Sequence, residues 1–246
     1  MIVSFRLALT VLGALLLAFV IACGAYGLSD VAARHSFDVR TSYSGVQALE
    51  IDGGDGDVHL STAPAGSAVA VVERVTEGLT SPHSDAVRTA GGVLHLSAVC
   101  SFVFSNSCGA RYTISVPPGV TVDAHSGGGN VDADNLTTTG PLKLSSGDGD
   151  VNALGIHAAD VTLQTGNGDV TATLNEVPTG LKASSGNGDV NLTVPNVTYA
   201  VHATSGNGTV SDGSLRIDPT ARRTITATSD NGDVNIKAAG TAGSGR

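Results

Sequence analysis

The stretch Ser185-Gly-Asn-Gly-Asp-Val190 is one copy of a phrase that recurs through the second half of the chain. The other copies are Ser126-Gly-Gly-Gly-Asn-Val131, Ser146-Gly-Asp-Gly-Asp-Val151, Thr165-Gly-Asn-Gly-Asp-Val170, Ser205-Gly-Asn-Gly-Thr-Val210 and Asp230-Asn-Gly-Asp-Val234. The closing valines are separated by steps of 20, 19, 20, 20 and 24 residues. A fixed step of this size indicates a repeat architecture. A further isolated copy, Gly54-Asp-Gly-Asp-Val58, stands far upstream.

The residues on either side of each phrase alternate between apolar and polar side chains, which is typical of strands with one buried face. Before the phrase, the expected inward positions are Val122/Ala124, Leu142/Leu144, Val161/Leu163, Leu181/Ala183, Val201/Ala203 and Ile225/Ala227. After it they are Val131/Ala133, Val151/Ala153, Val170/Ala172, Val190/Leu192, Val210 and Val234/Ile236. The pattern predicts an all-β protein with short strands and tight turns.

Two arrangements satisfy this alternation. In the first, each unit of about 20 residues is one coil of a β-solenoid, and coils stack about 4.8 Å apart. Equivalent outward residues then form a ladder of Asp132, Asn152, Thr171, Asn191, Ser211 and Asn235. In the second, each Asn-Gly pair is a type I′ hairpin turn between antiparallel strands. The periodicity alone does not choose between them.

The first half of the chain is also predicted to be β-rich but less regular. Strands are expected within 46–60, 69–75, 93–99 and 112–116, because β-branched residues alternate there and turn residues separate the runs. The predicted layout is a signal or anchor segment at 1–28, a linker at 29–44 and a β-strand-repeat domain at 45–237. That domain has an irregular part at 45–119 and regular repeats at 120–237. A flexible tail follows at 238–246, and a bulged loop is expected around Ser214–Ala221, where the step is longest.

The N-terminus reads as a targeting segment. Residues 7–22 carry no charge, a length that suits a signal peptide better than a spanning helix of about 20 residues. The run ends in Val20-Ile-Ala-Cys23, which resembles a bacterial lipobox and predicts lipidation at Cys23. An uncleaved anchor reaching Leu28 and ordinary secretion are the alternatives. The lipidated and anchored forms place the rest of the chain outside the membrane, attached to the cell.

Two cysteines remain, Cys100 and Cys108, and in an oxidising compartment an isolated close pair predicts a disulfide. Phe102 and Phe104 lie between them. This apolar pair is interpreted either as an exposed contact loop or as a plug that covers one end of the core.

The repeated phrase, the C-x₇-C pair and Val116-Pro-Pro-Gly-Val120 resemble a bacterial envelope family known as the putative-adhesin β-strand-repeat family. The likeness covers about residues 45–237. It implies a right-handed single-stranded β-helix, or β-solenoid, and so favours stacked coils over hairpins. The resemblance also implies an uncharacterised adhesion role at the cell envelope. The sequence departs from the repeat at Thr209, where the aspartate is lost.

The repeat-turn positions are occupied by acidic and amide side chains: Asp57, Asp150, Asp169, Asp189, Asp233, Asn167, Asn187, Asn207 and Asn231. Turn chemistry explains them, since glycine permits positive φ and aspartate accepts backbone N–H bonds. Stacked carboxylates also suggest calcium as a weaker hypothesis. No other metal and no cofactor is predicted.

The sequence carries none of the motifs for a nucleophile elbow, a zinc protease or a phosphate-binding loop, and we expect no enzyme activity. A polysaccharide-active β-helix enzyme would need stacked acidic or basic residues on one face, and Lys143, Lys182 and His202 are the only candidates. His59, His95 and His125 are likewise expected on outward positions. The net charge of −9 and the lack of a basic cluster argue against nucleic acid.

We therefore expect a non-catalytic, extracytoplasmic protein, tethered to the membrane by an N-terminal lipid or helix. Its expected partner is a glycan or a protein of the cell envelope, in an interaction or adhesion role. An accessory, sensor or scaffold protein that binds another envelope protein is the alternative.

Overall fold

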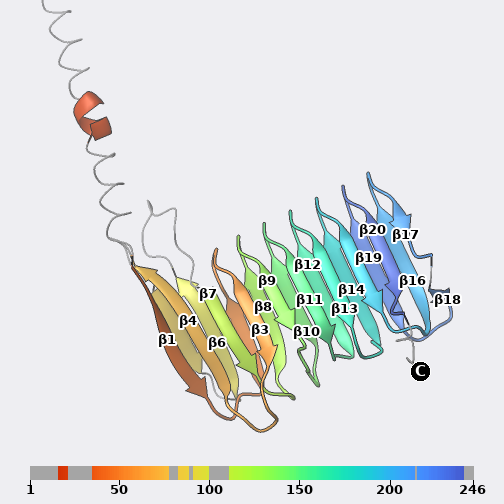
Figure 1. Ribbon diagram of the computed structural model, residues 1–246, viewed down its shortest axis with the longest axis horizontal. Helices are drawn as coiled ribbons and strands as arrows, with labels where there is room; N and C mark the ends of the chain where they lie inside the picture. Colours follow the sequence, from red (N-terminus) through yellow and green to blue (C-terminus); the bar gives the residue numbers. More distant parts are fainter. Residues whose placement is uncertain are drawn as a thin grey trace, which may run out of the picture.

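The computed structural model describes residues 16–21, 35–77, 83–88, 91–99, 111–213 and 215–240. Residues 16–21 are helical. In the remaining described ranges the chain forms two ten-stranded sheets that face each other along one long stack (Figure 1). The all-β class expected from the alternation is confirmed. No helix among the described residues is long and apolar enough to cross a membrane.

The first sheet, here called sheet A, contains every strand that follows a repeat phrase. Its spatial order is β1 (His35–Tyr43), β4 (Val69–Glu77), β7 (Arg111–Val116), β3 (Val58–Thr62), β9 (Val131–Asp134), β11 (Val151–Ile156), β13 (Val170–Leu174), β15 (Val190–Val194), β20 (Val234–Ala238) and β17 (Val210–Ser211). The strands from β7 to β17 run parallel, whereas β1 and β4 are antiparallel additions at one end.

The second sheet, sheet B, contains the strands that precede the phrases. Its order is β18 (Arg216–Ile217), β16 (Thr198–Ser205), β19 (Thr224–Ser229), β14 (Gly180–Ser185), β12 (Asp160–Thr165), β10 (Leu142–Ser146), β8 (Thr121–Ser126), β2 (Ala48–Asp52), β6 (Val93–Val99) and β5 (His83–Arg88). All neighbours are parallel except β5 and β6.

A sheet B strand, the phrase after it and the following sheet A strand are called a coil below. The two strands of one coil lie in different sheets, and each pairs with the equivalent strand of a neighbouring coil. For example, Leu181 of β14 is in register with Val161 of β12 and with Ile225 of β19. The hairpin arrangement is therefore wrong, because it would pair β14 with β15.

The coils are not stacked in sequence order, which corrects the simple ladder expected from the repeats. The coil of β19 and β20 lies between the β14/β15 coil and the β16/β17 coil, so the β16/β17 coil is outermost. The ladder thus runs Asn191, Asn235, Ser211. At the other end, the isolated upstream phrase joins β2 to β3, and that coil stacks directly on the coil of β8 and β9.

The core is the narrow space between the two sheets, and the alternation accounts for it. One inward row of sheet A consists of the closing valines 58, 131, 151, 170, 190 and 234, all fully buried. Leucine, isoleucine and alanine fill the facing rows, and only two tyrosines among the largest fully buried side chains, Tyr112 and Tyr199, are aromatic. Burial of such side chains stabilises the fold by roughly 1.5–3 kcal/mol each.

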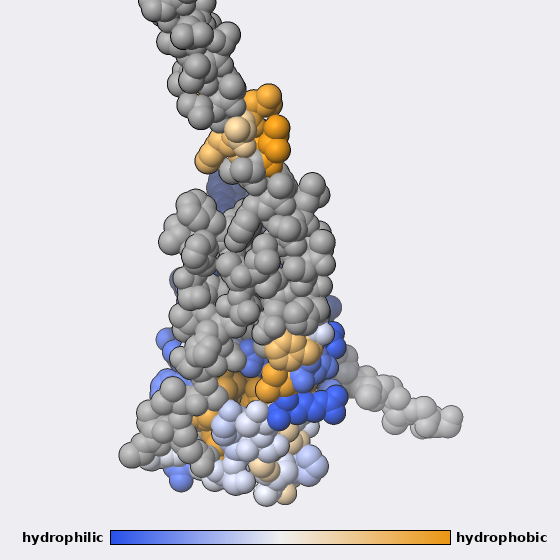
Figure 2. All heavy atoms as spheres, turned by 90° about the vertical axis from the view of Figure 1, so that its left-hand side faces the viewer, coloured by the Kyte–Doolittle hydropathy of each residue, from blue (hydrophilic) through white to orange (hydrophobic). Residues whose placement is uncertain are grey.

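The end of the stack nearest the N-terminus is more elaborate than expected. The segment 29–44 was predicted as a linker, but residues 35–43 form strand β1, paired with β4 from His35 through Tyr43. Strand β5 was also missed. Strand β1 is exposed along almost its whole length, and Phe37 and Val39 are each 41% exposed. Figure 2, which views the molecule from this end, shows hydrophobic surface among hydrophilic side chains.

At the opposite end, the chain between Val210 and Val234, which is the longest step between phrases, lies over the end of the stack. The loop expected near Ala221 is part of this segment. It contains strand β18, which pairs with Thr198 and Tyr199 of β16. Leu215 packs against the core, and the backbone N–H of Asp218 donates to the carbonyl of Tyr199. The loop covers only part of the terminal coil, since Val210 of β17 remains 44% exposed, and Ile217 of the loop itself is 46% exposed.

Candidate functional site

The repeat turns form the most regular polar feature of the molecule, and each residue type in the phrase has a separate contact. The residue five positions before each closing valine, called the first phrase residue below, reaches the neighbouring coil. The Ser185 hydroxyl donates to the carbonyl of Gly168 at 2.7 Å and accepts the N–H of Gly188 at 2.8 Å. Ser126, Ser146, Thr165, Ser205 and Ser229 do the same in their coils. The hydroxyl therefore ties two coils together.

The glycines of the phrase are required for a reason other than the one expected. Positive φ was predicted, but Gly54 is the only glycine of these phrases that has it. The others allow close approach between coils. A Cβ atom on Gly188 would overlap the carbonyl oxygen of Gly168, and one on Gly168 would overlap that of Gly149. Any side chain there would push neighbouring coils apart.

The fifth position of the phrase forms a carboxylate ladder. Oδ1 of Asp169 accepts the N–H of Asp189 at 2.8 Å, and Oδ1 of Asp189 accepts the N–H of Asp233 at 2.7 Å. In the same way, Oδ1 of Asp150 accepts the N–H of Asp169, and Oδ1 of Asp57 accepts the N–H of Asn130. The expected acceptor role of these aspartates is confirmed, although the donor comes from the next coil.

The aspartate ladder is closed at both ends. The Arg111 guanidinium donates twice to Oδ2 of Asp57, at 2.7 and 3.1 Å, at the β7 end. At the other end, Thr209 donates its N–H and its hydroxyl to Asp233 at 2.7 and 3.0 Å. These two bonds, the backbone one first, hold the pKa of Asp233 below its usual range. Thr209 has no carboxylate to offer to a further coil.

The third position forms an amide ladder beside the carboxylates. The Asn187 side-chain amide donates to Oδ1 of Asn167, Asn231 donates to Asn187 at 2.7 Å, and Asn207 donates to Asn231 at 2.7 Å. Each internal side chain is thus both donor and acceptor. Among the described residues, no group of three or more His, Cys, Asp and Glu is arranged to hold a metal ion.

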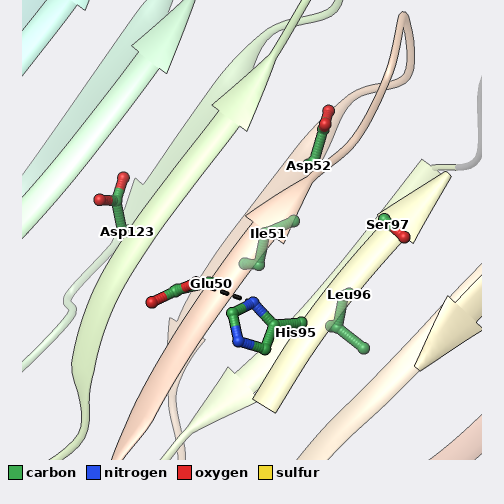
Figure 3. Close-up of a pocket in the computed structure, with 7 residues that line it drawn as sticks. All are labelled: Glu50, Ile51, Asp52, His95, Leu96, Ser97 and Asp123. Carbon is green, nitrogen blue, oxygen red and sulfur yellow. Dashed lines mark ion pairs between the residues drawn. The ribbon is translucent and has the colours of Figure 1, made fainter. Parts of the chain in front are cut away.

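A second polar feature lies on the outward face of sheet B, where sequence reasoning had placed only solvated side chains. We call it the charged row: His95 of β6, Glu50 of β2, Asp123 of β8 and Lys143 of β10, which occupy one register across four adjacent strands. His95 Nδ1 lies 2.7 Å from Glu50 Oε2 (Figure 3), and Lys143 Nζ lies 2.7 Å from Asp123 Oδ2. Two carboxylates are therefore flanked by two bases.

A shallow pocket of about 250 Å³ lies on this row. Its lining consists of Glu50, Ile51, Asp52, His95, Leu96, Ser97 and Asp123. Ile51 and Leu96 are buried, so the polar side chains at the rim are the groups that a ligand would meet. The hydrogen bond to Asp123 and then its charge raise the pKa of Lys143, which keeps the ammonium group charged.

The charged row is accessible, since its four side chains are between 40% and 58% exposed. Exposed ion pairs contribute only about 0–1 kcal/mol to stability. Their partners can therefore be exchanged for those of a ligand at little cost. Sequence reasoning missed the row because β2 and β6 lie far from β8 and β10 in the chain, and because their parallel pairing is not visible in the alternation.

The three basic candidates of the sequence lie on the same line. Continuing from Lys143, the register passes through Thr162, Lys182, Thr226 and His202. The expected equivalence of Lys143, Lys182 and His202 is confirmed. Threonines separate each pair, so these three bases are not adjacent.

Several predicted residues lie outside the described part of the chain. Cys23, Cys100, Cys108, Phe102 and Phe104 are among them, so the lipidation, the disulfide and the role of the phenylalanine pair stay predictions.

Fold and surface together define an all-β repeat protein of stacked two-strand coils with polar outer faces. A family model described as Toastrack DUF4097 matches residues 31–244, and the chain belongs to this family. This match establishes the family, and it does not test the repeat motif on which the expected resemblance rested. No curated protein matches the chain significantly.

Solved structures similar to this chain include two that are named for adhesion. One, described as a putative cell adhesion protein from Clostridium sporogenes, is 13% identical, with a TM-score of 0.49 over 83% of this chain and 100% of that one. A putative adhesin from Bacteroides fragilis is 19% identical, with a TM-score of 0.48 over 83% of this chain and 97% of that one. A protein from Parabacteroides distasonis described as a putative lipid binding protein is 9% identical, with a TM-score of 0.28 over 84% of this chain and 95% of that one.

Proposed function

We propose that this protein is a non-catalytic interaction module of the cell envelope, held at the outer side of the membrane by its N-terminal segment. The observation that carries the proposal is the charged row, an accessible and partly neutralised set of four groups on a flat sheet. Such a surface suits reversible contact with a polar partner, because weak exposed ion pairs can be replaced by ligand contacts.

The N-terminal tether is supported by the surface of residues 16–21. Leu16, Leu17, Phe19, Val20 and Ile21 are each between 59% and 68% exposed, which is unfavourable in water and favourable in a lipid environment. The tethered end is also the end that carries the charged row, since β6 and β2 lie near β1 in the stack (Figure 1). In this proposal the row belongs to the tethered end of the stack, where other envelope components are its candidate partners.

We also propose that the coils wind as a right-handed single-stranded solenoid. The support is general: a strand, a crossover and a parallel strand in the same sheet are right-handed in about 98% of known cases. The strands β10, β12 and β14 are connected in this way through sheet A.

The partner class follows from the chemistry of the row. Carboxylates, an imidazole and an ammonium can bind hydroxyls, amides and charged groups, which glycans and protein surfaces both offer. Aromatic platforms for sugar stacking are not part of the row. The lack of these platforms favours a protein partner over a glycan. The second candidate function is therefore that of a sensor or scaffold that binds another envelope protein.

The test is a binding experiment with the full-length chain in detergent, immobilised and offered purified envelope glycans and, separately, solubilised envelope proteins. A matched pair of variants locates the site. Glu50→Gln with Asp123→Asn removes two carboxylates from the outer face of sheet B, and Asp132→Asn with Asp134→Asn removes two from the outer face of sheet A. We expect saturable binding that the first variant weakens at least about tenfold and the second leaves unchanged.

Equal binding by both variants would place the contact surface elsewhere. Absence of saturable binding to either class would overturn the interaction role and leave a structural envelope module.

A further inference from the structure

Four repeat turns contain the dipeptide Asn-Gly at the same place in the coil. They are Asn167-Gly168, Asn187-Gly188, Asn207-Gly208 and Asn231-Gly232. In each, the glycine N–H is held by the hydroxyl of the first phrase residue, at 3.2 Å for Gly168, 2.8 Å for Gly188 and Gly232, and 2.7 Å for Gly208. The four sites therefore share the reactive dipeptide and one local hydrogen bond, and they differ in the coils that lie on either side.

Asn-Gly is the dipeptide most prone to spontaneous deamidation, because glycine has no side chain to hinder the attack. The backbone nitrogen of the glycine bonds to Cγ of the asparagine, and the Cγ–Nδ2 bond breaks. The glycine N–H proton leaves with the side-chain nitrogen as ammonia, and a cyclic imide remains. Water then opens the ring at either carbonyl, giving aspartate or isoaspartate. The reaction needs only water and a backbone free to move.

At the three internal sites the surroundings oppose each step. The side-chain amides of Asn167, Asn187 and Asn231 donate to one neighbouring coil and accept from the other. The hydroxyls that hold the glycine N–H groups, on Thr165, Ser185 and Ser229, are buried. Coils on both sides press against the glycines. Ring closure requires the coil to separate from its neighbours.

At Asn207 half of these restraints are missing, because the β16/β17 coil is outermost. Asn207 still donates to Asn231, but Oδ1 of Asn207 accepts no hydrogen bond from the described residues. Gly208 is exposed, and Ser205, which holds its N–H, is half-exposed. Strand β17, which follows the turn, has only two residues and two pairs to β20. Local opening here is the least costly of the four sites.

We propose that Asn207 is a site of spontaneous deamidation in the folded protein, and that the coil stack protects Asn167, Asn187 and Asn231. The product alters the outermost coil. A carboxylate at 207 loses the Nδ2 donor and faces the Asn231 oxygen, and it adds negative charge beside Asp230 and Asp233. The turn of the outermost coil then separates more easily from the β19/β20 coil. A long-lived tethered protein would thus change first at the end that is farthest from its anchor.

The test is peptide mapping by mass spectrometry of the full chain, incubated in mildly alkaline buffer and sampled over time. In the folded protein we expect residue 207 to deamidate at least about tenfold faster than each of the other three sites, a difference that corresponds to about 1.4 kcal/mol. In strong denaturant we expect all four to react at comparable rates. The internal sites serve as controls within the same molecule.

A variant tests the role of the hydrogen bond to the glycine. Ser205→Ala frees the Gly208 N–H and should accelerate deamidation at 207 severalfold. The matched internal variant, Ser185→Ala, should leave residue 187 slower than residue 207, because neighbouring coils still enclose it. In the folded wild-type chain, a deamidation rate at residue 207 no faster than the rates at residues 167, 187 and 231 would overturn the proposal.

Discussion

The internal coils and the outermost coil carry nearly the same phrase and yet lie in different environments. Ser185 and Ser205 make the same two hydrogen bonds, but Ser185 is buried and Ser205 is half-exposed. The Asp189 carboxylate accepts the N–H of Asp233 in the next coil, whereas Thr209 donates to Asp233 and has no carboxylate to accept a further bond. A complete phrase can form hydrogen bonds to a coil on each side. The phrase with Thr209 in place of aspartate lacks the carboxylate that accepts from a further coil, so its coil needs only one neighbour.

The end of the carboxylate ladder at Thr209 also accounts for the order of the coils. A coil in the interior must donate to one neighbour and accept from the other, and Asp230-Asn-Gly-Asp-Val234 retains the carboxylate that does so. The phrase that ends in Val210 does not. The β19/β20 coil therefore suits the interior position, and the β16/β17 coil suits the end, although the chain reaches the end first.

The largest effect is expected from adding a side chain between two internal coils. Gly188→Ala places a methyl group against the carbonyl of Gly168 and should lower the free energy of unfolding by about 2–4 kcal/mol. Gly213→Ala, near the exposed end, meets nothing within 4 Å and should change it by less than about 0.5 kcal/mol. Urea denaturation of both variants makes the comparison, and equal stabilities would contradict the close approach of the coils.

The next effect separates the two equivalent serines. Ser185→Ala leaves the Gly168 carbonyl and the Gly188 N–H without a partner in a buried position, and should cost about 1–3 kcal/mol. Ser205→Ala should cost less than about 1 kcal/mol, because water reaches the half-exposed site. Thermal unfolding followed by circular dichroism measures both. A larger loss for Ser205→Ala would show that the outermost coil is not the weaker one.

A smaller effect is expected from acid. The pKa of Asp233 is lowered by the two hydrogen bonds from Thr209, so ionised Asp233 stabilises the folded state. That contribution is complete above the ordinary aspartate value of 3.8 and is lost as the pH falls through the lower folded value. The protection of the Thr209 amide, which is its exchange rate relative to the intrinsic rate at the same pH, should therefore fall as the pH drops below 3.8. Asp233→Asn, which keeps an acceptor oxygen, should abolish this pH dependence.

The sequence predicted the strands and the inward rows well because alternation is a local property. Val131, Val151 and Val170 recur at a constant step, and burial of one face follows directly. The hydroxyl, carboxylate and amide ladders follow from the same step, once stacking rather than hairpin pairing is known.

The features that the sequence did not predict depend on pairing between distant strands. Nothing in the local pattern places Glu50 beside Asp123, or the phrase at Val58 beside the one at Val131. Strand β1 was missed because residues 36–43 mix exposed polar and apolar side chains, and because its only partner strand among the described residues is β4. The positive φ expected of the repeat glycines was wrong because close contact between coils, and not turn conformation, requires them.

The most direct test of the account is the order of the last coils. Residues 191 and 235 are register partners in adjacent parallel strands, where Cα atoms lie about 4.8 Å apart, within the range of a disulfide. Residues 191 and 211 are separated by β20. We expect the variant Asn191→Cys with Asn235→Cys to form a disulfide on mild oxidation, detected by peptide mapping, and Asn191→Cys with Ser211→Cys to form none. A bridge between 191 and 211 instead would show that the coils stack in sequence order, and would contradict both the position of Thr209 and the exposed site at Asn207.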